Sequence, residues 1–325
     1  MSDDVVIRRA DVSDFPAVVA LARRALGWTD DDASFLSWKH VENPFGTSPM
    51  WVATDDGQVV GFRTFLRWEF VRPDGSSCRA VRAVDTATDP DHQGRGIFTR
   101  LTREAVAALP GEGIELIFNT PNGKSLPGYL KMGWSELGAL PVAVMPTSWR
   151  FPVVVGTARR AAERNPLPAR SGADPDAVFG DDDLPGLLDA QPRPARFTTA
   201  KSRAFLQWRY GNPELGYRVV LTKSERVADG FAVFRRRRRG SALEGVLCDV
   251  IAPRGDEATT RALIRRVAAV AGADYLIRID GRVATLDPFV RLPRVGPVLA
   301  CRPLDGGRPP ARNDFSLNMG DVELF

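Results

Sequence analysis

Residues 84–98 read VDTATDPDHQGRGIF, and this stretch joins a strand to a glycine loop and then to a helix. The β-branched and small residues of 84–88 are typical of a strand. Gly94 and Gly96 follow, and glycine lets backbone N–H groups converge because no Cβ is in the way. A helix that begins after Gly96 adds unpaired N–H groups and the positive end of its dipole. These features predict an anion site suited to a diphosphate.

Two other phosphate-binding patterns fit this chain poorly. A dinucleotide fingerprint needs a third glycine, and Thr99 stands at that place. Residues 123–125 read Gly-Lys-Ser after a predicted strand, but a nucleotide-binding P-loop also needs a glycine where Phe118 stands. A plain structural turn stays open as the alternative for the glycine loop.

The glycine loop resembles the coenzyme A loop, Q/R-x-x-G-x-G/A, of the GCN5-related N-acetyltransferases (GNAT). Here it reads QGRGIF over residues 93–98, with Phe98 in place of the final small residue. That departure is similar to the branch that includes the mycobacterial enhanced-intracellular-survival acetyltransferases. The resemblance implies acetyl-CoA as co-substrate, bound by Ala87, Thr88, Gln93, Gly94, Arg95, Gly96, Ile97, Phe98, Asn122 and Ser125.

A second motif lies downstream, where Tyr129-x-x-x-Gly133-Trp134 is similar to the family's Y-x-x-x-G-F signature. The resemblance implies that Tyr129 donates a proton to the leaving thiolate. Phenols have a usual pKa of about 10 and are protonated at neutral pH, which suits this acid role. A purely packing role for Tyr129 is the alternative.

The base that would take the proton of the amine has two candidates. Asp85 lies on the strand before the loop, and Glu69 lies on the strand before that. Direct attack of a neutral amine on a thioester needs positioning and proton removal, and it needs no metal. Either acid can equally be a buried structural acceptor.

The two halves of the chain resemble each other. FLSWKH at 35–40 is echoed by FLQWRY at 205–210, Asn43-Pro44 returns as Asn212-Pro213, and Gly61-Phe62 returns as Gly230-Phe231. The nearly constant offset predicts a duplicated domain. In the second half PRGDE replaces the glycine loop at 253–257, and Phe289 stands in the place of Tyr129. The second copy is therefore predicted to be non-catalytic.

These observations predict an α/β (α+β) fold of two tandem GNAT-like domains, each a mixed, mostly antiparallel sheet flanked by helices. A length of 325 residues suits two domains. The expected division is a catalytic domain at 1–150, a proline-rich linker at 151–196 with a short helix near 156–164, and a degenerate domain at 197–325. In the first copy we expect strands at 5–8, 50–53, 59–68, 78–88, 115–119 and 142–145, and helices at 13–26, 33–40, 98–109 and 126–131. Ser13 is expected to cap the first helix and Gly27 to end it.

The composition narrows the classes of protein. There is no run of 18 apolar residues, so no membrane span is expected. Three scattered cysteines, Cys78, Cys248 and Cys301, favour a reducing cytoplasm over a disulfide framework. Two histidines, His40 and His92, exclude a multi-histidine metal site.

The net charge of +4 is too small to imply a nucleic-acid partner by itself. The strongest basic run, Arg235–Arg239, is expected to be the solvated edge of an exposed hairpin.

The sequence thus predicts a cytoplasmic N-acetyltransferase that transfers an acetyl group from acetyl-CoA to a primary amine, with Tyr129 as the general acid. The amine can belong to a small molecule or a peptide. The alternative is a non-catalytic acyl-CoA sensor or regulatory scaffold on the same fold. The identity of the acceptor and of the base, the length of the acyl group and the existence of a homo-oligomer stay open.

Overall fold

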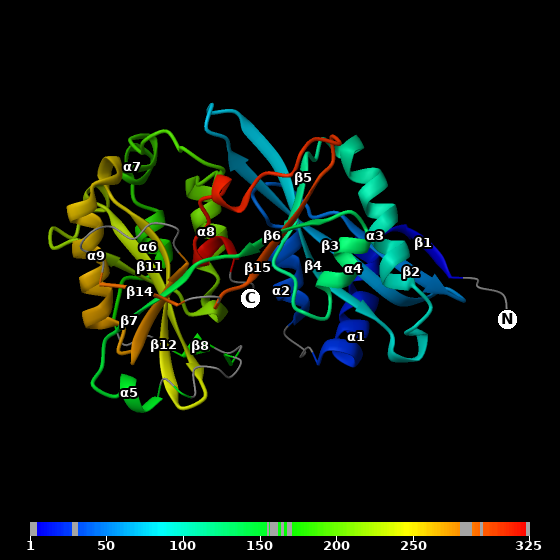
Figure 1. The fold of residues 1–325 in the computed structure, drawn as a ribbon, viewed down its shortest axis with the longest axis horizontal. Coiled ribbons are helices and arrows are strands. Elements are labelled where there is room, and N and C mark those ends of the chain that lie inside the picture. The colour runs from blue at the N-terminus through cyan, green and yellow to red at the C-terminus, as the bar shows by residue number, and fades with distance from the viewer. Residues whose placement is uncertain are drawn as a thin grey trace. The chain divides into compact units, whose positions relative to one another are not determined.

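A computed structural model describes residues 5–27, 32–154, 156, 162–163, 166–167, 171–279, 288–292 and 295–322 (Figure 1). The chain divides into two compact units, and neither is one continuous segment. The first unit comprises residues 1–71, 76–138 and 297–312. The second comprises 72–75, 139–296 and 313–325. The division therefore differs from the expected split near residue 150, because each unit includes chain from both halves.

The first unit contains a mixed sheet with the strand order β1-β2-β3-β4-β5-β15-β6. Its strands are β1 (Val6–Arg9), β2 (Met50–Asp55), β3 (Gln58–Val71), β4 (Ser77–Thr88), β5 (Leu116–Asn119), β6 (Ser135–Ala139) and β15 (Val298–Pro303). Its helices are α1 (Phe15–Leu26), α2 (Asp32–His40), α3 (Ile97–Ala108) and α4 (Leu126–Lys131), with 3-10 turns at Val12–Asp14, Pro90–His92 and Leu109–Glu112. From β1 to α4 the helices and strands follow the order that the sequence predicted, while β6 and β15 were not predicted.

The second unit repeats this pattern with the strand order β10-β11-β12-β13-β7-β14, while β8 pairs with β11. Its strands are β7 (Val142–Pro146), β8 (Pro166–Leu167), β10 (Arg218–Leu221), β11 (Phe231–Arg239), β12 (Ala242–Ile251), β13 (Tyr275–Ile279) and β14 (Val290–Leu292), and β9 (Thr198–Thr199) is a further short strand. Its helices are α5 (Phe151–Val154), α6 (Pro175–Phe179), α7 (Leu184–Asp189), α8 (Arg203–Gly211), α9 (Glu257–Val270) and α10 (Met319–Val322). Shorter 3-10 turns lie at Pro213–Leu215, Val227–Asp229, Pro253–Gly255 and Arg312–Asp314.

The two halves of the chain exchange one strand each. β15 comes from the end of the chain and lies between β5 and β6 in the first sheet. β7 comes from the first half and lies between β13 and β14 in the second sheet. Residues 142–145 were correctly predicted as a strand, but the strand belongs to the second sheet.

Helices α1 and α3 cover opposite faces of the first sheet (Figure 1), and a hydrophobic cluster lies under each of them. α1 packs against Phe62 and Ala87 on one face, and α3 packs against Phe65 on the other. The alternation of side chains along β3 explains why Phe62 and Phe65 face opposite ways. The predicted site therefore lies on a sheet that is buried on both faces.

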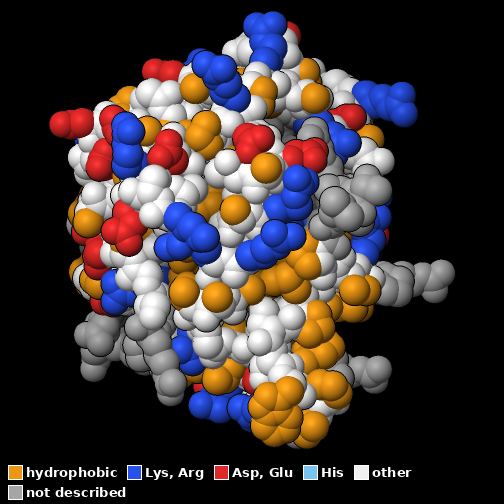
Figure 2. Space-filling model, turned by 90° about the vertical axis from the view of Figure 1, so that its left-hand side faces the viewer, with side chains coloured by type: hydrophobic (Ala, Val, Ile, Leu, Met, Phe, Trp, Pro, Cys, Tyr) orange, Lys and Arg blue, Asp and Glu red, His pale blue; other side chains and the backbone are white. Residues whose placement is uncertain are grey.

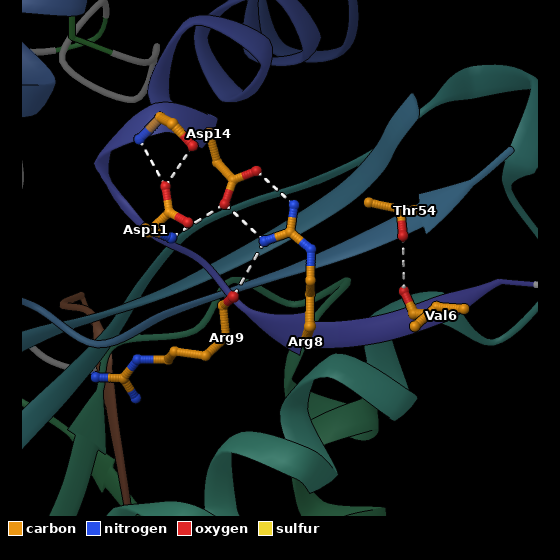
Figure 3. A network of polar contacts seen from close by, with 7 residues as sticks. Val6, Arg8, Arg9, Asp11, Asp14 and Thr54 are labelled. Atoms are coloured by element: carbon orange, nitrogen blue, oxygen red, sulfur yellow. Dashed lines mark hydrogen bonds and ion pairs between the residues drawn. The ribbon is translucent and has the colours of Figure 1, made fainter. Parts of the chain in front are cut away.

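The start of α1 is fixed by a network of polar contacts (Figure 3). Asp11 accepts a hydrogen bond from the Ser13 backbone N–H at 2.7 Å, and Asp14 accepts one from the Asp11 N–H at 3.0 Å. Arg8 donates to both carboxylate oxygens of Asp14 at 2.6 and 2.7 Å. The prediction of Ser13 as the cap was wrong: Asp14 is the N-cap of α1, and Asp11 forms a capping box with Asp14 in the 3-10 turn that leads into this helix. Gly27 ends α1 in the left-handed conformation, as predicted.

The proline-rich stretch is more ordered than a linker from residue 171 onward. It contains α6 and α7, whose apolar side chains Val178, Phe179, Leu184 and Leu187 are buried. The expected helix near 156–164 falls largely outside the described residues.

The arginine run lies on β11 and is largely compensated within the second unit. Arg235 and Arg236 are 4% and 7% exposed, so the prediction of a solvated edge was wrong for them. Arg237 and Arg239 form ion pairs with the buried Glu244 at 2.5 and 2.9 Å. Burial by itself raises the pKa of Glu244, but these two guanidinium groups outweigh it and lower that pKa. On the face of the molecule shown in Figure 2, basic and acidic side chains are interspersed, so this face has no large patch of one charge sign.

Candidate functional site

One edge of β4 is open where the cofactor was predicted to pair. β4 pairs with β5 in parallel only from Ala80 to Arg82, opposite Leu116 to Phe118. The pairing of β4 with β3 continues as far as Thr88. Residues 83–88 thus have a strand partner on the β3 side, while the β5 side lacks one among the described residues. Such an edge can pair with the amide groups of an extended ligand.

A β-bulge lies within this open edge. Arg63 pairs with Thr86 and Thr64 pairs with Val84, so Asp85 is the extra residue on β4. Asp85 has a φ of +36°, a region that Asp adopts more readily than most residues. A bulge bends its strand, which is consistent with the divergence of β4 from β5 beyond Arg82.

No side chain of the glycine loop caps the N–H groups at the start of α3. Gly94 and Gly96 have φ values of +79° and +72°, which explains the need for glycine at both places. Gly96 is the N-cap of α3, and in the described part of the chain this terminus has no side-chain cap. The first N–H groups of the helix are therefore available to an anion.

A cavity of about 580 Å³ connects these features. Ligand pockets commonly have volumes of this size. Eleven residues line the cavity, and they come from the end of α1, the open edge of β4, the loop and the first turn of α3: Ala25, Leu26, Thr86, Ala87, Thr88, His92, Gln93, Gly94, Gly96, Ile97 and Phe98. The structure thus brings together most of the predicted cofactor-binding residues.

Arg95 and His92 of the loop share one carboxylate. Arg95 lies 3.1 Å from Asp55, and His92 lies 3.2 Å from the same oxygen. His92 also lies 3.5 Å from Asp89. His92 is therefore a half-buried residue that lies between two acids.

Tyr129 of α4 is buried beside the cavity wall. It is 4% exposed, and its ring packs edge-on against Phe98, with 5.8 Å between the ring centroids. Its hydroxyl oxygen accepts a hydrogen bond of 2.5 Å from Arg63 of β3. The sequence did not single out Arg63, because an arginine in a strand is usually a surface residue.

The carboxylate of Asp85 contacts two side chains of α2. Its carboxylate lies 2.8 Å from Lys39 Nζ and 2.8 Å from His40 Nε2. Burial alone raises the pKa of Asp85, but Lys39 and His40 outweigh it and hold that pKa well below its usual range. Burial lowers the pKa of His40 despite the neighbouring carboxylate. Asp85 therefore has the properties of a structural anion more than those of a base.

The remaining predicted residues lie elsewhere. Glu69 lies five residues along β3 from Thr64, or about 17 Å from the bulge at 3.3 Å per residue. Asn122 and Ser125 form a turn before α4, in which Asn122 Oδ1 accepts from the Ser125 N–H at 2.9 Å. None of the three lines the cavity.

The equivalent place in the second unit is filled by a carboxylate. The N-cap of α9 is Asp256, whose side chain accepts a hydrogen bond of 2.6 Å from the Thr259 N–H. This contact lowers the pKa of Asp256. An anion at this helix start would meet a negative charge.

The described residues include neither a cluster of metal ligands nor a membrane-spanning helix. No group of three or more His, Cys, Asp or Glu among the described residues could hold a metal ion. In that same part of the chain, no helix is long and apolar enough to cross a membrane. Cys78, Cys248 and Cys301 are free and buried.

A family model matches most of the first unit. Residues 6–137 match the family described as acetyltransferase (GNAT) domain. No curated protein sequence matches this chain.

Solved structures resemble the chain over both units. A probable N-acyltransferase from Enterococcus faecalis has a TM-score of 0.66 at 13% identity, covering 93% of this chain and 73% of that one. A GCN5-related N-acetyltransferase from Anabaena variabilis has a TM-score of 0.64 at 12% identity, covering 92% and 73%. Eis1 from Mycobacterium abscessus has a TM-score of 0.56 at 16% identity, covering 93% and 74%. The prediction of two GNAT-like domains is confirmed at the level of the fold.

Proposed function

Because residues 6–137 form a GNAT acyltransferase domain, we propose that this chain transfers an acyl group from acyl-CoA to a primary amine. The observation that carries the proposal is the single cavity of about 580 Å³ that joins the open edge of β4 to the uncapped start of α3. An extended amide-bearing chain that ends in a diphosphate matches both features. Acetyl-CoA is the simplest such donor, and longer acyl groups stay open.

The residues of the first unit have distinct roles in this proposal. The N–H groups at the start of α3 would bind the diphosphate, and Ala87 and Thr88 of β4 would orient the donor through their backbone. The hydroxyl group of Tyr129 would give its proton to the leaving thiolate. The walls made by Ile97 and Phe98 would exclude water from the thioester.

The proton of the amine has no settled acceptor. Asp85 is engaged by Lys39 and His40, and Glu69 lies about 17 Å along β3 from the bulge by strand geometry. Removal by solvent water is the simplest course, since no metal is needed for attack by a neutral amine. A small-molecule or peptide amine remains the expected acceptor.

A second candidate function is an acyl-CoA sensor that binds without turnover. The observation in its favour is the engagement of Asp85, which removes the best-placed base. The cytoplasmic location and the formation of a homo-oligomer stay predictions.

The test is release of free thiol from acetyl-CoA in the presence of a panel of amines. We expect saturable turnover, and Tyr129→Phe should lower kcat by about 100-fold with acyl-CoA affinity changed less than about threefold. Binding without turnover on any amine would favour the sensor. Absence of any acyl-CoA binding, measured by calorimetry and thermal shift, would overturn both functions.

A further inference from the structure

Arg63 is a buried cation without a carboxylate partner. Its side chain is 1% exposed, and among the described residues no acid lies within ion-pair distance of it. Its Nε atom is buried without a hydrogen-bond partner. Elsewhere in the first unit, guanidinium groups such as Arg24 and Arg67 pair with acids at 2.8 and 2.6 Å. A buried charge with so little compensation destabilises a protein, so a functional reason for it is expected.

The surroundings of Arg63 are aromatic. Its guanidinium carbon lies 5.1 Å from the ring centroids of Phe65 and Phe98 and 5.3 Å from that of Tyr129. The negative faces of these rings attract a cation weakly and compensate the charge only in part. The NH2 group of Arg63 donates its hydrogen bond of 2.5 Å to the Tyr129 hydroxyl.

This position lies directly behind the wall of the cavity. Arg63 pairs with Thr86 across the β3–β4 ladder at the bulge, and Thr86 lines the cavity. Phe98 also lines the cavity and packs edge-on against Tyr129. Arg63 itself is too buried to meet a ligand, so it acts through Tyr129.

The hydrogen bond fixes where the hydroxyl proton of Tyr129 can go. A guanidinium group has only donors, so the oxygen of Tyr129 is the acceptor in this contact. The phenolic O–H must then point away from Arg63 toward another acceptor. That arrangement keeps the proton available for the thiolate that leaves the donor.

We propose that Arg63 is a positioning residue that orients the hydroxyl of Tyr129 and stabilises the phenolate formed when Tyr129 gives up its proton. This inference rests on the proposed function. In the step, the amine nitrogen bonds to the acyl carbon and the carbon–sulfur bond breaks. The phenolic O–H bond breaks as the S–H bond forms, the electron pair stays on the Tyr129 oxygen, and the proton lost by the amine passes to solvent. The phenolate later regains a proton from solvent.

The buried charge of Arg63 then stabilises a charge that forms during the reaction. Negative charge appears on Tyr129 only as the thiolate leaves, beside a cation that is already in place. The attraction between the Arg63 guanidinium and the Tyr129 phenolate is strong because both side chains are buried away from water. It is far weaker while Tyr129 still carries its proton. The interaction should therefore affect kcat and leave acyl-CoA binding nearly unchanged.

The experiment is a double-mutant cycle of Arg63→Met and Tyr129→Phe, with kcat and KM measured for acetyl-CoA and an accepted amine. We expect Arg63→Met to lower kcat by about 100-fold and to change KM for acetyl-CoA by less than about threefold. In the Tyr129→Phe background, Arg63→Met should cost less than about threefold, because no phenolate forms.

Arg82 offers a matched control on the neighbouring strand. It is also 1% exposed, donates to Thr120 Oγ1 at 3.1 Å and lies 5.9 Å from the Phe118 ring centroid. Arg82→Met should keep kcat within about threefold of wild type. If Arg63→Met does not unfold cooperatively, Arg63→Lys and Arg63→Gln replace it in the test. Because lysine keeps the positive charge, kcat of Arg63→Lys should be at least about tenfold higher than kcat of Arg63→Gln.

The outcomes separate this inference from the proposed function. Wild-type protein without turnover overturns the proposed function and this inference with it. Wild-type turnover that is unchanged in Arg63→Met overturns the inference alone. The inference also fails if Arg63→Met costs the same in both Tyr129 backgrounds, if Arg82→Met loses as much kcat, or if the lysine and glutamine variants are equal.

Discussion

Helix α3, which follows β4 in the first unit, and helix α9, which follows β12 in the second unit, differ in their N-cap residues. In the first unit Gly96 leaves the start of α3 without a side-chain cap among the described residues, while in the second unit Asp256 caps α9 through Thr259. The carboxylate satisfies the helix dipole from within the chain. The start of α9 is thus capped from within the chain and, unlike the start of α3, has no free place for an anion.

A second pair of equivalent contacts has been kept. His40 at the end of α2 bonds to Asp85 of β4, and Tyr210 near the end of α8 bonds to Asp249 of β12. Asp249 pairs with Val233 next to a β-bulge on β12, as Asp85 is the bulged residue of β4. Retention of this contact in the unit predicted to be non-catalytic indicates that it fastens the helix to the sheet.

The strand exchange predicts the largest effect, which is loss of folding on truncation. A fragment of residues 1–150 lacks β15, which lies between β5 and β6. In the fragment β6 therefore has no neighbouring strand, and β5 is unpaired on the side away from β4. It also contains β7 without the sheet in which β7 belongs. We expect no cooperative thermal transition in circular dichroism, whereas the full chain should show one. A fragment that melts cooperatively within a few degrees of the full chain would contradict the importance of the exchange.

Gly96→Asp tests the comparison of the helix termini directly, because it gives α3 the carboxylate of α9. Like charges in contact cost several kcal/mol, so we expect acetyl-CoA affinity measured by calorimetry to fall by at least about 100-fold. Gly96→Asn is the matched control, since Asn adopts left-handed backbone about as readily and carries no charge. Equal losses for Asp and Asn would show that backbone strain, and not charge, decides binding. Asp256→Gly should leave the affinity unchanged.

The sequence predicted the local elements of the first unit well because their signals are local. Gly94 and Gly96, the strand before them and the helix after them occupy a few consecutive residues, and each has a direct backbone reason. The motif around Tyr129 was equally compact, and the structure places its ring against the cavity wall.

The features that the sequence missed depend on pairings distant in the chain. The periodicity of 142–145 indicates a strand but not which sheet receives it. The run at 235–239 was predicted to be exposed and Arg63 was not singled out, because the sequence around a charged residue does not show that Glu244 or aromatic rings contact it in the fold. The engagement of Asp85 likewise depends on α2, more than 40 residues earlier.

The contact between His40 and Asp85, which has an equivalent in the second unit, predicts the smallest effect, a difference in acid sensitivity. Burial lowers the pKa of His40, so as the pH falls below about 6.5 the unfolded chain binds a proton that the folded chain does not. Stability is therefore lost as the pH falls. Asp85, whose pKa is also held low, adds a further loss below about pH 4, where the unfolded carboxyl is protonated first. Tyr210 does not titrate in this range, because burial raises its pKa well above the usual value.

The measurement is the free energy of unfolding in urea at pH 7 and pH 5.5 for wild type and His40→Gln. We expect wild type to lose about 1 kcal/mol more than His40→Gln over this interval, whatever their difference at pH 7. Tyr210→Phe is the control from the second unit, and its loss over the same interval should equal that of wild type. If His40→Gln loses as much as wild type, His40 takes up its proton in the folded state, and the ion pair with Asp85 dominates over burial.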